Sequence, residues 1–473
     1  MAKETGIAWT DSTWNPLRGT EGRWFCTKVD ELCHNCYAER MNIRFGGPKF
    51  TQNADQIRLD EDALALPFSW EGRKIFVCSM SDLFHESVPF AWIDRIFGVM
   101  HLLQRHTFQV LTKRAERMAA YLSDPATPNR IFQAADAISV ARRALQIRQE
   151  VRPIAGYPGY FVSNAGTVYS TTGSGICLYC GVVIDRKGKQ RYCSQRCRWN
   201  ADYERRTGKP PRYSPTLKAM SPERQKKGHL RVTLRNDQGI KKEELHRIVL
   251  SVFDRPPIGD EQGRHLNGDP TNNHIANLVW GTQEENWSDR NRHGNGRSYS
   301  KLTHAQVESI RNRATIGETV ASLADAFGIS DTQIRNVVAQ KQWATTKGWP
   351  LRNCWHGVSV GTRAGLRRLA FLRRVPSTVR WVSLEPLLED LGAFDLSGAN
   401  WYVAGGESGA GARRTELNWF RTILTRCHDS GIPFFMKQTG EVLARELGCK
   451  DRAGKKPEEW PADLRIQEFP ALA

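Results

Sequence analysis

A break in periodicity near the middle of the chain limits its possible folds more than any other pattern. Short apolar runs rich in β-branched and aromatic residues alternate with helix-like stretches up to about Glu150, and the alternation resumes at about Lys347. Alternating strands and helices predict an α/β fold with a parallel sheet, here a partial (β/α) barrel. We therefore expect one domain that is built from both ends of the chain and interrupted by an insertion. The outer apolar runs are KIFVCSM (74–80), FQVLT (108–112), WHGVSV (355–360), VRWVSLEP (379–386), NWYVAGG (400–406) and PFFMKQ (433–438).

The inserted segment is more basic than the rest of the chain. Residues 151–343 hold 30 Lys and Arg against 18 Asp and Glu, whereas the other 280 residues hold 38 against 32. An excess of positive charge suits a polyanion, and we expect double-stranded DNA as the partner of this segment. A solvated basic face with no partner has the same composition.

Length and composition indicate a chain of several domains without a membrane segment. The chain has 473 residues, of which 40% are hydrophobic, and no apolar run of about 18 residues occurs in it. The first residues, MAKETGIAWTDSTWNP, lack the pattern of a signal peptide. We therefore expect a cytoplasmic protein. Because disulfides are rare in that compartment, clustered cysteines indicate metal sites.

Four cysteines of the insertion have the spacing of a structural zinc site. In CLYCGVVIDRKGKQRYCSQRC, a CxxC pair and a CxxxC pair are separated by twelve residues. Four thiolates at this spacing close a tetrahedral Zn²⁺ site and leave no open position for catalysis. Four free thiols are the alternative. The expected ligands are Cys177, Cys180, Cys193 and Cys197.

Residues 245–292 resemble the HNH endonucleases of phage and homing elements. The resemblance is carried by LHRIVLSVFDRPPIGDEQGRHLNGDPTNNHIANLVWGTQEENWSDRNR, and it implies an α+β fold of the ββα-metal kind. His265 then matches the general base that activates water, and Asn277 matches the residue that orients it. Asn286 matches a ligand of a divalent ion. A neutral imidazole accepts a proton near pH 7, and an amide oxygen suits Mg²⁺ or Mn²⁺.

One position departs from the pattern of that family. Many relatives carry an acidic ligand just before the catalytic histidine, where this chain has Arg264, which we expect to contact DNA instead. Asp269 and Asp289 are the candidates for the missing carboxylate. His246 and His274 are expected to be structural. A nuclease fold that only binds DNA is the alternative.

The flanks of this core also point to DNA. GYFVSNAGTVYS (159–170) resembles a small module that precedes many HNH cores, and SLADAFGISDTQIRNVVAQKQW (322–343) resembles a helix-turn-helix with Gly328 at its turn. A generic helical hairpin has the same periodicity. The side chains expected to face a major groove are Ser330, Thr332, Gln333, Arg335 and Asn336.

The first part of the outer domain holds three further clustered cysteines. Cys26, Cys33 and Cys36 lie in CTKVDELCHNCYAERM with six and two residues between them. Three thiolates can hold three irons of a [4Fe–4S] cluster and leave the fourth iron open to a small molecule. A zinc site completed by His34 is the alternative.

The outer parts resemble a phage-encoded family of radical-SAM-like proteins of unknown function. The resemblance spans most of residues 7–149 and 347–441 and implies S-adenosylmethionine at the open iron, cleaved to a 5′-deoxyadenosyl radical. It leaves the substrate open, a nucleic acid or a protein. The first cysteine gap is three residues longer than in the usual CxxxCxxC of radical enzymes. The shared motifs are AWTDSTWNP, CYAER, SMSDLFHE, FQVLTKR, WHGVSV, VSLEPLL, GGESGAGAR and PFFMKQTGE.

Polar residues follow the predicted strands, where barrels build their sites. Simple ion pairs and a tight glycine turn are the alternatives. The candidates for cofactor binding are Glu385, Gly406, Glu407, Ser408 and Lys437. Further polar residues at strand ends are Ser81, Asp82, His85, Lys113, Arg114 and Gln438.

These observations favour an HNH homing endonuclease lodged in a radical-SAM-like gene of phage or prophage origin. A non-cleaving nucleic-acid-binding protein with structural metals is one alternative, and an active radical enzyme with a passive insertion is another. The expected divisions are the outer domain (1–149 and 347–473), a DNA-contact module (150–174), the zinc knuckle and linker (175–215), the HNH core (225–295) and the helix-turn-helix (300–343).

Overall fold

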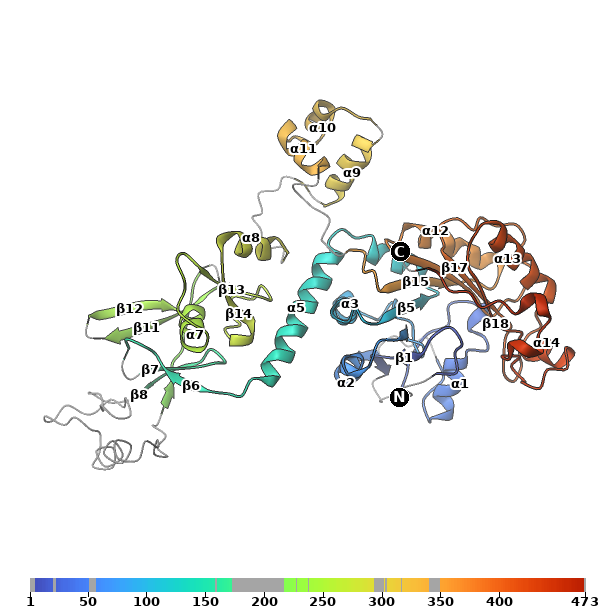
Figure 1. The fold of residues 1–473 in the computed structure, drawn as a ribbon, viewed down its shortest axis with the longest axis horizontal. Helices are drawn as coiled ribbons and strands as arrows, with labels where there is room; N and C mark the ends of the chain where they lie inside the picture. Colours follow the sequence, from blue (N-terminus) through green and yellow to red (C-terminus); the bar gives the residue numbers. More distant parts are fainter. Residues whose placement is uncertain are drawn as a thin grey trace. The chain divides into compact units, whose positions relative to one another are not determined.

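The computed structural model describes residues 5–19, 23–50, 57–157, 160–171, 217–226, 228–236, 238–292, 302, 304–315, 317–339 and 349–471. It divides into two compact units (Figure 1). Unit 1 consists of Met1–Ala135 and Tyr299–Ala473, and unit 2 consists of Asp136–Ser298. Both ends of the chain therefore belong to one unit.

Unit 1 is built on a curled, parallel, seven-stranded half-barrel sheet. β5 pairs directly with β15, from Phe108 opposite Cys354 to Thr112 opposite Val358. Strands from before and after the insertion thus lie side by side, and the expected partial barrel is confirmed. In sheet order the strands are β1 (Ser12–Trp14), β4 (Lys74–Val77), β5 (Thr107–Thr112), β15 (Cys354–Ser359), β16 (Val379–Leu384), β17 (Trp401–Gly405) and β18 (Phe434–Gln438).

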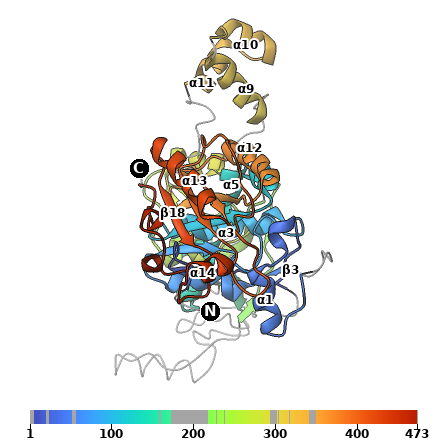
Figure 2. The ribbon, with the colours of Figure 1, turned by 90° about the vertical axis from the view of Figure 1, so that its right-hand side faces the viewer.

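Helices occur in the connections between successive strands of this sheet except the one from β16 to β17, residues 385–400, which contains none (Figures 1 and 2). The strand residues are buried on both faces, so the strands are apolar almost throughout. The helices of unit 1 are α1 (Tyr37–Arg44), α2 (Glu61–Ala65), α3 (Phe90–Leu102), α4 (Ala115–Leu122), α12 (Arg367–Arg374), α13 (Leu417–Asp429) and α14 (Glu441–Glu446). α5 (Thr127–Gln146) runs across the boundary between the units, and β2 (Leu17–Gly19) pairs with β3 (Ile57–Leu59).

Large aromatic side chains fill one face of the curled sheet. Trp355, Trp381 and Trp401 come from three neighbouring strands and pack with Trp9 in one buried cluster. Gly357 makes room for them, because a Cβ there would lie 2.5 Å from ring atoms of Trp381. The period-2 alternation of a strand places Ser383 on the same face as Trp381, one step nearer the carboxyl end. On this face of the sheet, the buried aromatic layer is therefore followed by polar residues towards the carboxyl ends of the strands.

Unit 2 is an α+β unit with its own core. Its largest buried groups include Trp280, Leu245, Val249 and Leu234. The strands are β6 (Val151–Pro153), β7 (Tyr160–Ser163), β8 (Val168–Thr171) and β9 (Leu217–Ala219) in one sheet, β10 (Glu223–Arg224), β11 (Leu230–Asn236) and β12 (Gly239–Glu244) in a second, and β13 (Gln262–His265) with β14 (Leu278–Gly281) in a third. The helices are α7 (Leu245–Phe253) and α8 (Gln283–Arg292).

Three short helices form a small bundle with its own core. They are α9 (His304–Thr315), α10 (Val320–Phe327) and α11 (Asp331–Val338). Gly328 ends α10 with φ 64°, and Ser330 and Gln333 form a capping box at the start of α11. Ile334 and Val337 are the buried residues of α11, so this helix has one apolar face in the core of the bundle.

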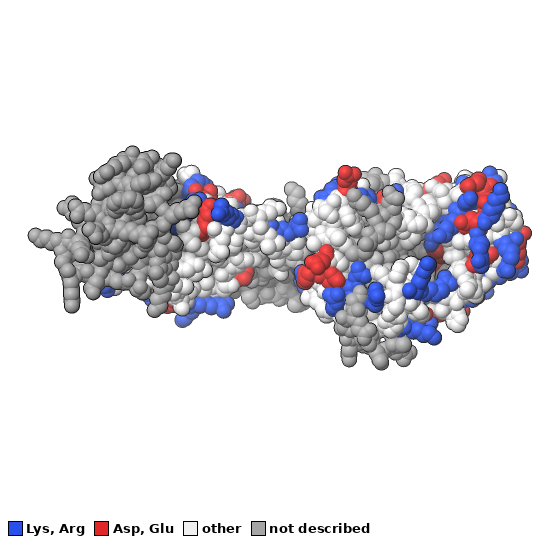
Figure 3. Space-filling model, turned by 90° about the horizontal axis from the view of Figure 1, so that it is seen from below, with Lys and Arg blue, Asp and Glu red and all other residues white. Residues whose placement is uncertain are grey.

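No helix in the described part of the chain is both long and apolar enough to cross a membrane. On the face drawn in Figure 3, basic and acidic side chains are interspersed at the end of unit 1 that carries α14. That part of the surface therefore has no extended patch of a single sign. The four cysteines of the predicted zinc knuckle lie outside the described residues.

Candidate functional site

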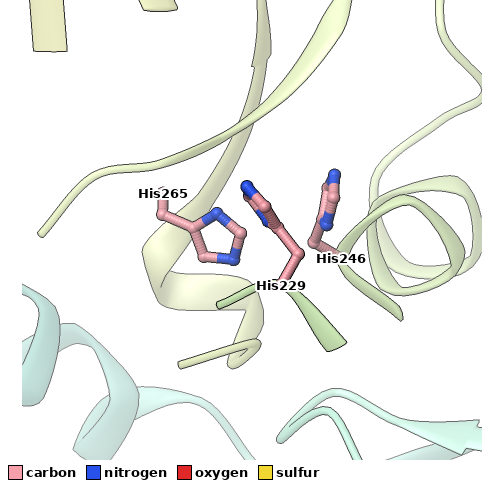
Figure 4. A group of neighbouring side chains, drawn as sticks. All are labelled: His229, His246 and His265. Carbon is pink, nitrogen blue, oxygen red and sulfur yellow. The ribbon is translucent and has the colours of Figure 1, made fainter. Parts of the chain in front are cut away.

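Three histidines meet in unit 2 from three different elements (Figure 4). His229 directly precedes β11, His246 lies in the first turn of α7, and His265 is the last residue of β13. Their ring centroids are 5.1–5.4 Å apart. One ligand atom from each ring lies within 4.8 Å of the other two. The sequence separates these residues, and only the packing of two sheets against α7 brings them together.

The loop between β13 and β14 positions His265 through asparagines. The Nε2 atom of His265 lies 3.2 Å from Oδ1 of Asn273. Asn277 is fully buried; it accepts a hydrogen bond from the Asn267 backbone (2.9 Å) and donates one to the Asn272 carbonyl (2.8 Å). Asn277, the predicted orienting residue, therefore holds the loop, while Asn273 contacts the histidine itself.

Burial keeps two of these imidazoles neutral. Desolvation, reinforced by the neighbouring histidines, lowers the pKa of His246 to about 3. Desolvation also lowers the pKa of His265 to about 4, although Asn273 opposes the shift. Both rings therefore keep a free lone pair at neutral pH, which a proton acceptor or a metal ligand needs.

We predict that unit 2 loses stability when the pH falls from about 6.5 to about 4. Unfolded histidines take up a proton near pH 6.5, whereas His265 and His246 resist protonation down to about 4 and about 3. In this window the unfolded state binds more protons, so the free energy of unfolding falls as the pH falls. Thermal unfolding followed near pH 7 and near pH 5 measures the effect. The stability of the variant His265→Gln should change less between these two pH values than that of the wild type. An equal change in both proteins would contradict the prediction.

An open cleft of about 730 Å³ lies beside the histidines. His229, His246 and Asn286 line it. His265 is not part of the lining, and its ring centroid lies 5.1 Å from that of His246. The Asn286 amide nitrogen donates to Gln262 Oε1 (2.6 Å), which leaves its amide oxygen for other partners. The acidic residues of the lining are Glu223 and Glu244, and its basic residues are Arg224, Lys226, Arg231, Arg247 and Arg290.

Arg264, predicted to contact DNA, makes ion pairs within unit 2. Its guanidinium contacts Asp289 (2.8 Å) and Glu285 (3.0 Å), and only 12% of its side chain is exposed. These pairs connect β13 with α8. Asp289, one candidate for the missing carboxylate, is therefore already paired with a cation. The other candidate, Asp269, accepts hydrogen bonds from Thr271 within its own turn.

Sequence reasoning missed His229 and took His246 to be structural. His229 stands alone before a strand, and no spacing rule connects it with a histidine 17 or 36 residues later. The histidine periodicity of a metal-binding helix was absent, so no local signal was available. Only the tertiary structure reveals the cluster.

The predicted groove-facing residues of α11 differ in their surroundings. Thr332 and Arg335 are exposed, and Asn336 is half-buried. Gln333 is also half-buried, and its side chain accepts from the Ser330 backbone (3.2 Å) in the capping box. The structure therefore assigns Gln333 a local capping contact and leaves the exposed pair for a ligand.

In unit 1 the three clustered cysteines line one pocket of about 320 Å³. Cys33 ends a short 3₁₀ helix, and Cys36 immediately precedes α1. Burial, reinforced by the Asp82 carboxylate, raises the pKa of Cys26 to about 12. A fourth cysteine, Cys78, lines the same pocket in a left-handed backbone conformation with φ 57°. His34, the alternative zinc ligand, is exposed and is not part of this lining.

All five predicted cofactor-binding residues line the same pocket, and several are paired with one another or with neighbours. Lys437 forms an ion pair with Glu385, and Glu407 binds Arg413 (2.7 Å). Hydrogen bonds from Arg413 and Asn35 lower the pKa of Glu407 against the effect of burial. A Cβ at Gly406 would lie 2.1 Å from the Thr439 carbonyl, so this position requires glycine. The five are Glu385, Gly406, Glu407, Ser408 and Lys437.

The strand-end residues of the first half surround the same pocket. Arg114 is buried and contacts Asp82 (3.2 Å) and Glu86 (2.8 Å). Asp82 accepts a further hydrogen bond from Thr112 (2.7 Å). His85 is not part of the pocket lining. It is buried, and its Nε2 atom lies 2.9 Å from Oγ1 of Thr27. The carboxyl ends of the strands thus converge on the cysteines, as the parallel sheet predicts. The remaining strand-end residues in the lining are Ser81, Lys113 and Gln438.

Comparison with known proteins gives one family match. A family described as a protein of unknown function (DUF5131) matches residues 4–151 and 280–465. No curated protein matches the chain. A solved structure, described as DNA binding and cleavage by the HNH homing endonuclease I-HmuI, is 19% identical and has a TM-score of 0.21. The match covers 42% of this chain and 94% of that one. At this identity and TM-score the likeness supports no conclusion about this chain.

Proposed function

Because the chain belongs to DUF5131, a family of unknown function, and its copy of the family domain is interrupted, we propose that the interrupting segment is a metal-dependent DNA endonuclease of the HNH type. The observation that carries this proposal is the open cleft of unit 2, which basic side chains line together with His229 and His246, two members of the histidine cluster that contains His265. Basic side chains hold phosphates, and a neutral imidazole is the group that activates water beside them.

The chemistry of the proposed reaction starts at His265. Its neutral ring accepts a proton from water as the water oxygen forms a bond to the phosphorus of a phosphodiester held at the cleft. One ester P–O bond of the phosphodiester breaks, and the departing sugar oxygen takes a proton from solvent. Asn273 accepts from Nε2 of His265 and so favours the tautomer with a lone pair on Nδ1. Asn277 keeps the loop in this geometry through its two buried hydrogen bonds.

The same cleft also carries oxygen atoms of the kind that bind a divalent ion. The amide oxygen of Asn286 and the carboxylate of Glu223 are hard ligands of the kind that Mg²⁺ and Mn²⁺ prefer. Bound there, the ion would stabilise negative charge on the phosphate oxygens. Incubation of plasmid DNA with the protein and Mg²⁺ or Mn²⁺ tests the proposal, and nicking is the expected result.

We predict that Arg231→Ala weakens DNA binding for all sequences and lowers the slope of log affinity against log salt by about 1. Arg231 lines the cleft, and its removal deletes one phosphate contact. Arg235 lies on the same strand, is exposed and is not part of the lining, so Arg235→Ala is the matched control. Fluorescence anisotropy at several salt concentrations measures both slopes. If the salt dependence of DNA affinity is the same for the two variants, DNA does not bind in this cleft.

A second function is favoured by the pocket of unit 1. We propose that Cys26, Cys33 and Cys36 hold a [4Fe–4S] cluster whose open iron takes S-adenosylmethionine. The observation behind this proposal is that the three clustered thiols and polar residues at the ends of six strands line one pocket. Bound there, the cluster would supply the electron that cleaves S-adenosylmethionine. The protein side chains Glu385, Glu407 and Lys437 would hold the charged ends of that molecule.

A further inference from the structure

We propose that His229, His246 and His265 form a binding site for a transition-metal ion of the zinc class, distinct from the Mg²⁺ or Mn²⁺ site proposed at Asn286. Three imidazoles and no carboxylate make up the group. Imidazole nitrogen favours zinc, cobalt, nickel and copper, whereas Mg²⁺ requires oxygen. The two sites therefore select different ions.

The spacing of the rings is close to that of a coordinated ion. Ligand atoms from the three histidines lie within 4.8 Å of one another. Zinc–nitrogen bonds of about 2.0–2.1 Å in a tetrahedron place the nitrogens about 3.3 Å apart. Closing the gap requires each ring to move by roughly 1 Å, which a side-chain rotation supplies. Figure 4 shows the three rings next to one another, with the ring of His229 drawn between those of His265 and His246.

Two of the rings, those of His246 and His265, each have one nitrogen beside an oxygen atom of a neighbouring side chain. Metal-bound histidines in proteins commonly make such a contact with the nitrogen that does not bind the metal. The Glu244 carboxylate lies 3.4 Å from Nε2 of His246, which favours a proton on that atom and a lone pair on Nδ1. Nδ1 of His246 is buried and has no hydrogen-bond partner in the described part of the chain. Asn273 contacts Nε2 of His265 in the same way. Two lone pairs are thus presented by oriented, buried rings.

The backbone beside the cluster is adapted to the rings. A Cβ at Gly263 would lie 2.4 Å from Cδ2 of His246, so β13 approaches this ring as closely as glycine permits. That contact holds the Cδ2–Nε2 edge of His246 against the strand. The opposite edge, with Nδ1, is the one left for a ligand.

Occupancy of this site has a consequence that rests on the proposed nuclease function. An ion bound to His265 takes the lone pair that would accept the proton of water. Zinc is therefore an inhibitor of cleavage supported by Mg²⁺, and the cluster is a point at which zinc concentration controls the enzyme. Binding of the ion does not itself depend on the nuclease function.

A cobalt titration of the full chain tests the site directly. The protein is first saturated with zinc at its thiolate sites and freed of weakly bound metal. Co²⁺ is then added to the wild type, to His229→Gln and to His274→Asn. We expect the wild type and His274→Asn to bind about one more Co²⁺ than His229→Gln, with visible d–d bands and no sulfur charge-transfer band. His274 lies on the same loop as His265 but outside the cluster, and asparagine preserves its capping role.

The outcomes separate the site from the nuclease. Equal Co²⁺ binding by wild type and His229→Gln would overturn the site, whatever the DNA assay shows. If nicking occurs, about one equivalent of Zn²⁺ should slow the wild type at least about tenfold, and His229→Gln should lose most of this sensitivity. If zinc inhibits the wild type and His229→Gln equally, the proposal that zinc inhibits cleavage through this cluster is overturned. If no nicking occurs in any condition, the proposed nuclease function is rejected, and the cobalt titration still decides whether the three histidines bind a metal ion.

Discussion

Replacing His265 by alanine is expected to slow nicking of plasmid DNA by about 10²–10⁴-fold, the range that a general base contributes. His265 is buried at the end of β13, and its lowered pKa of about 4 keeps it neutral at physiological pH. It therefore accepts a proton in each turnover without first losing one. The rate of conversion of supercoiled to nicked plasmid at saturating Mg²⁺ measures the loss.

The matched control for this variant is His274→Asn. His274 lies nine residues further on, and its ring accepts from the Ala276 backbone (3.1 Å) at the start of a 3₁₀ turn. Asparagine replaces that cap and removes an imidazole from the same loop. We expect this variant to nick at nearly the wild-type rate. Equal loss in both variants, or no loss in either, would remove His265 from the role of base.

Replacing Cys36 by alanine is expected to reduce the iron and sulfide content of anaerobically purified protein to less than about a tenth of the wild-type value. Cys36 lines the pocket of unit 1 together with Cys26 and Cys33, and two thiolates do not retain a [4Fe–4S] cluster. Iron, acid-labile sulfide and the visible absorption spectrum measure the effect.

Cys449→Ser is the control for this second experiment. Cys449 is half-buried, and its sulfur lies 3.5 Å from the Glu459 carbonyl, away from the pocket lining. Its replacement should leave the iron content unchanged. Wild-type protein that binds zinc and no iron would reject the cluster and favour a structural metal. Unchanged iron in Cys36→Ala would place the cluster on other ligands.

The architecture of unit 1 was predictable because its strands are local and buried on both faces. Runs such as VRWVSL carry enough apolar character to identify β16, and helices between the runs require parallel pairing. The convergence of Glu385, Glu407 and Lys437 follows from that topology, since parallel strands end at one edge. The ion pairs Glu385–Lys437 and Glu407–Arg413 could not be predicted in this way, because they depend on which side chains meet across the pocket.

The site of unit 2 was predicted only in part. The motif around His265 identified one imidazole, the loop asparagine Asn277 and the cleft residue Asn286. It identified neither His229 nor the role of Asn273 as the contact of His265. Arg264 looked free to bind DNA because the sequence does not show that α8 brings Asp289 and Glu285 against it.

The sequence by itself determined the interruption of the chain, the parallel half-barrel and the residue types at its strand ends. These depend on hydrophobic periodicity and on turn residues, which act over a few positions along the chain. Only the tertiary structure decided which groups share a site: the pairing of β5 with β15, the fourth cysteine Cys78 in the pocket, and the three imidazoles. Such contacts join residues that are far apart in the chain. They are set by packing between elements, for which no local pattern in the sequence provides a signal.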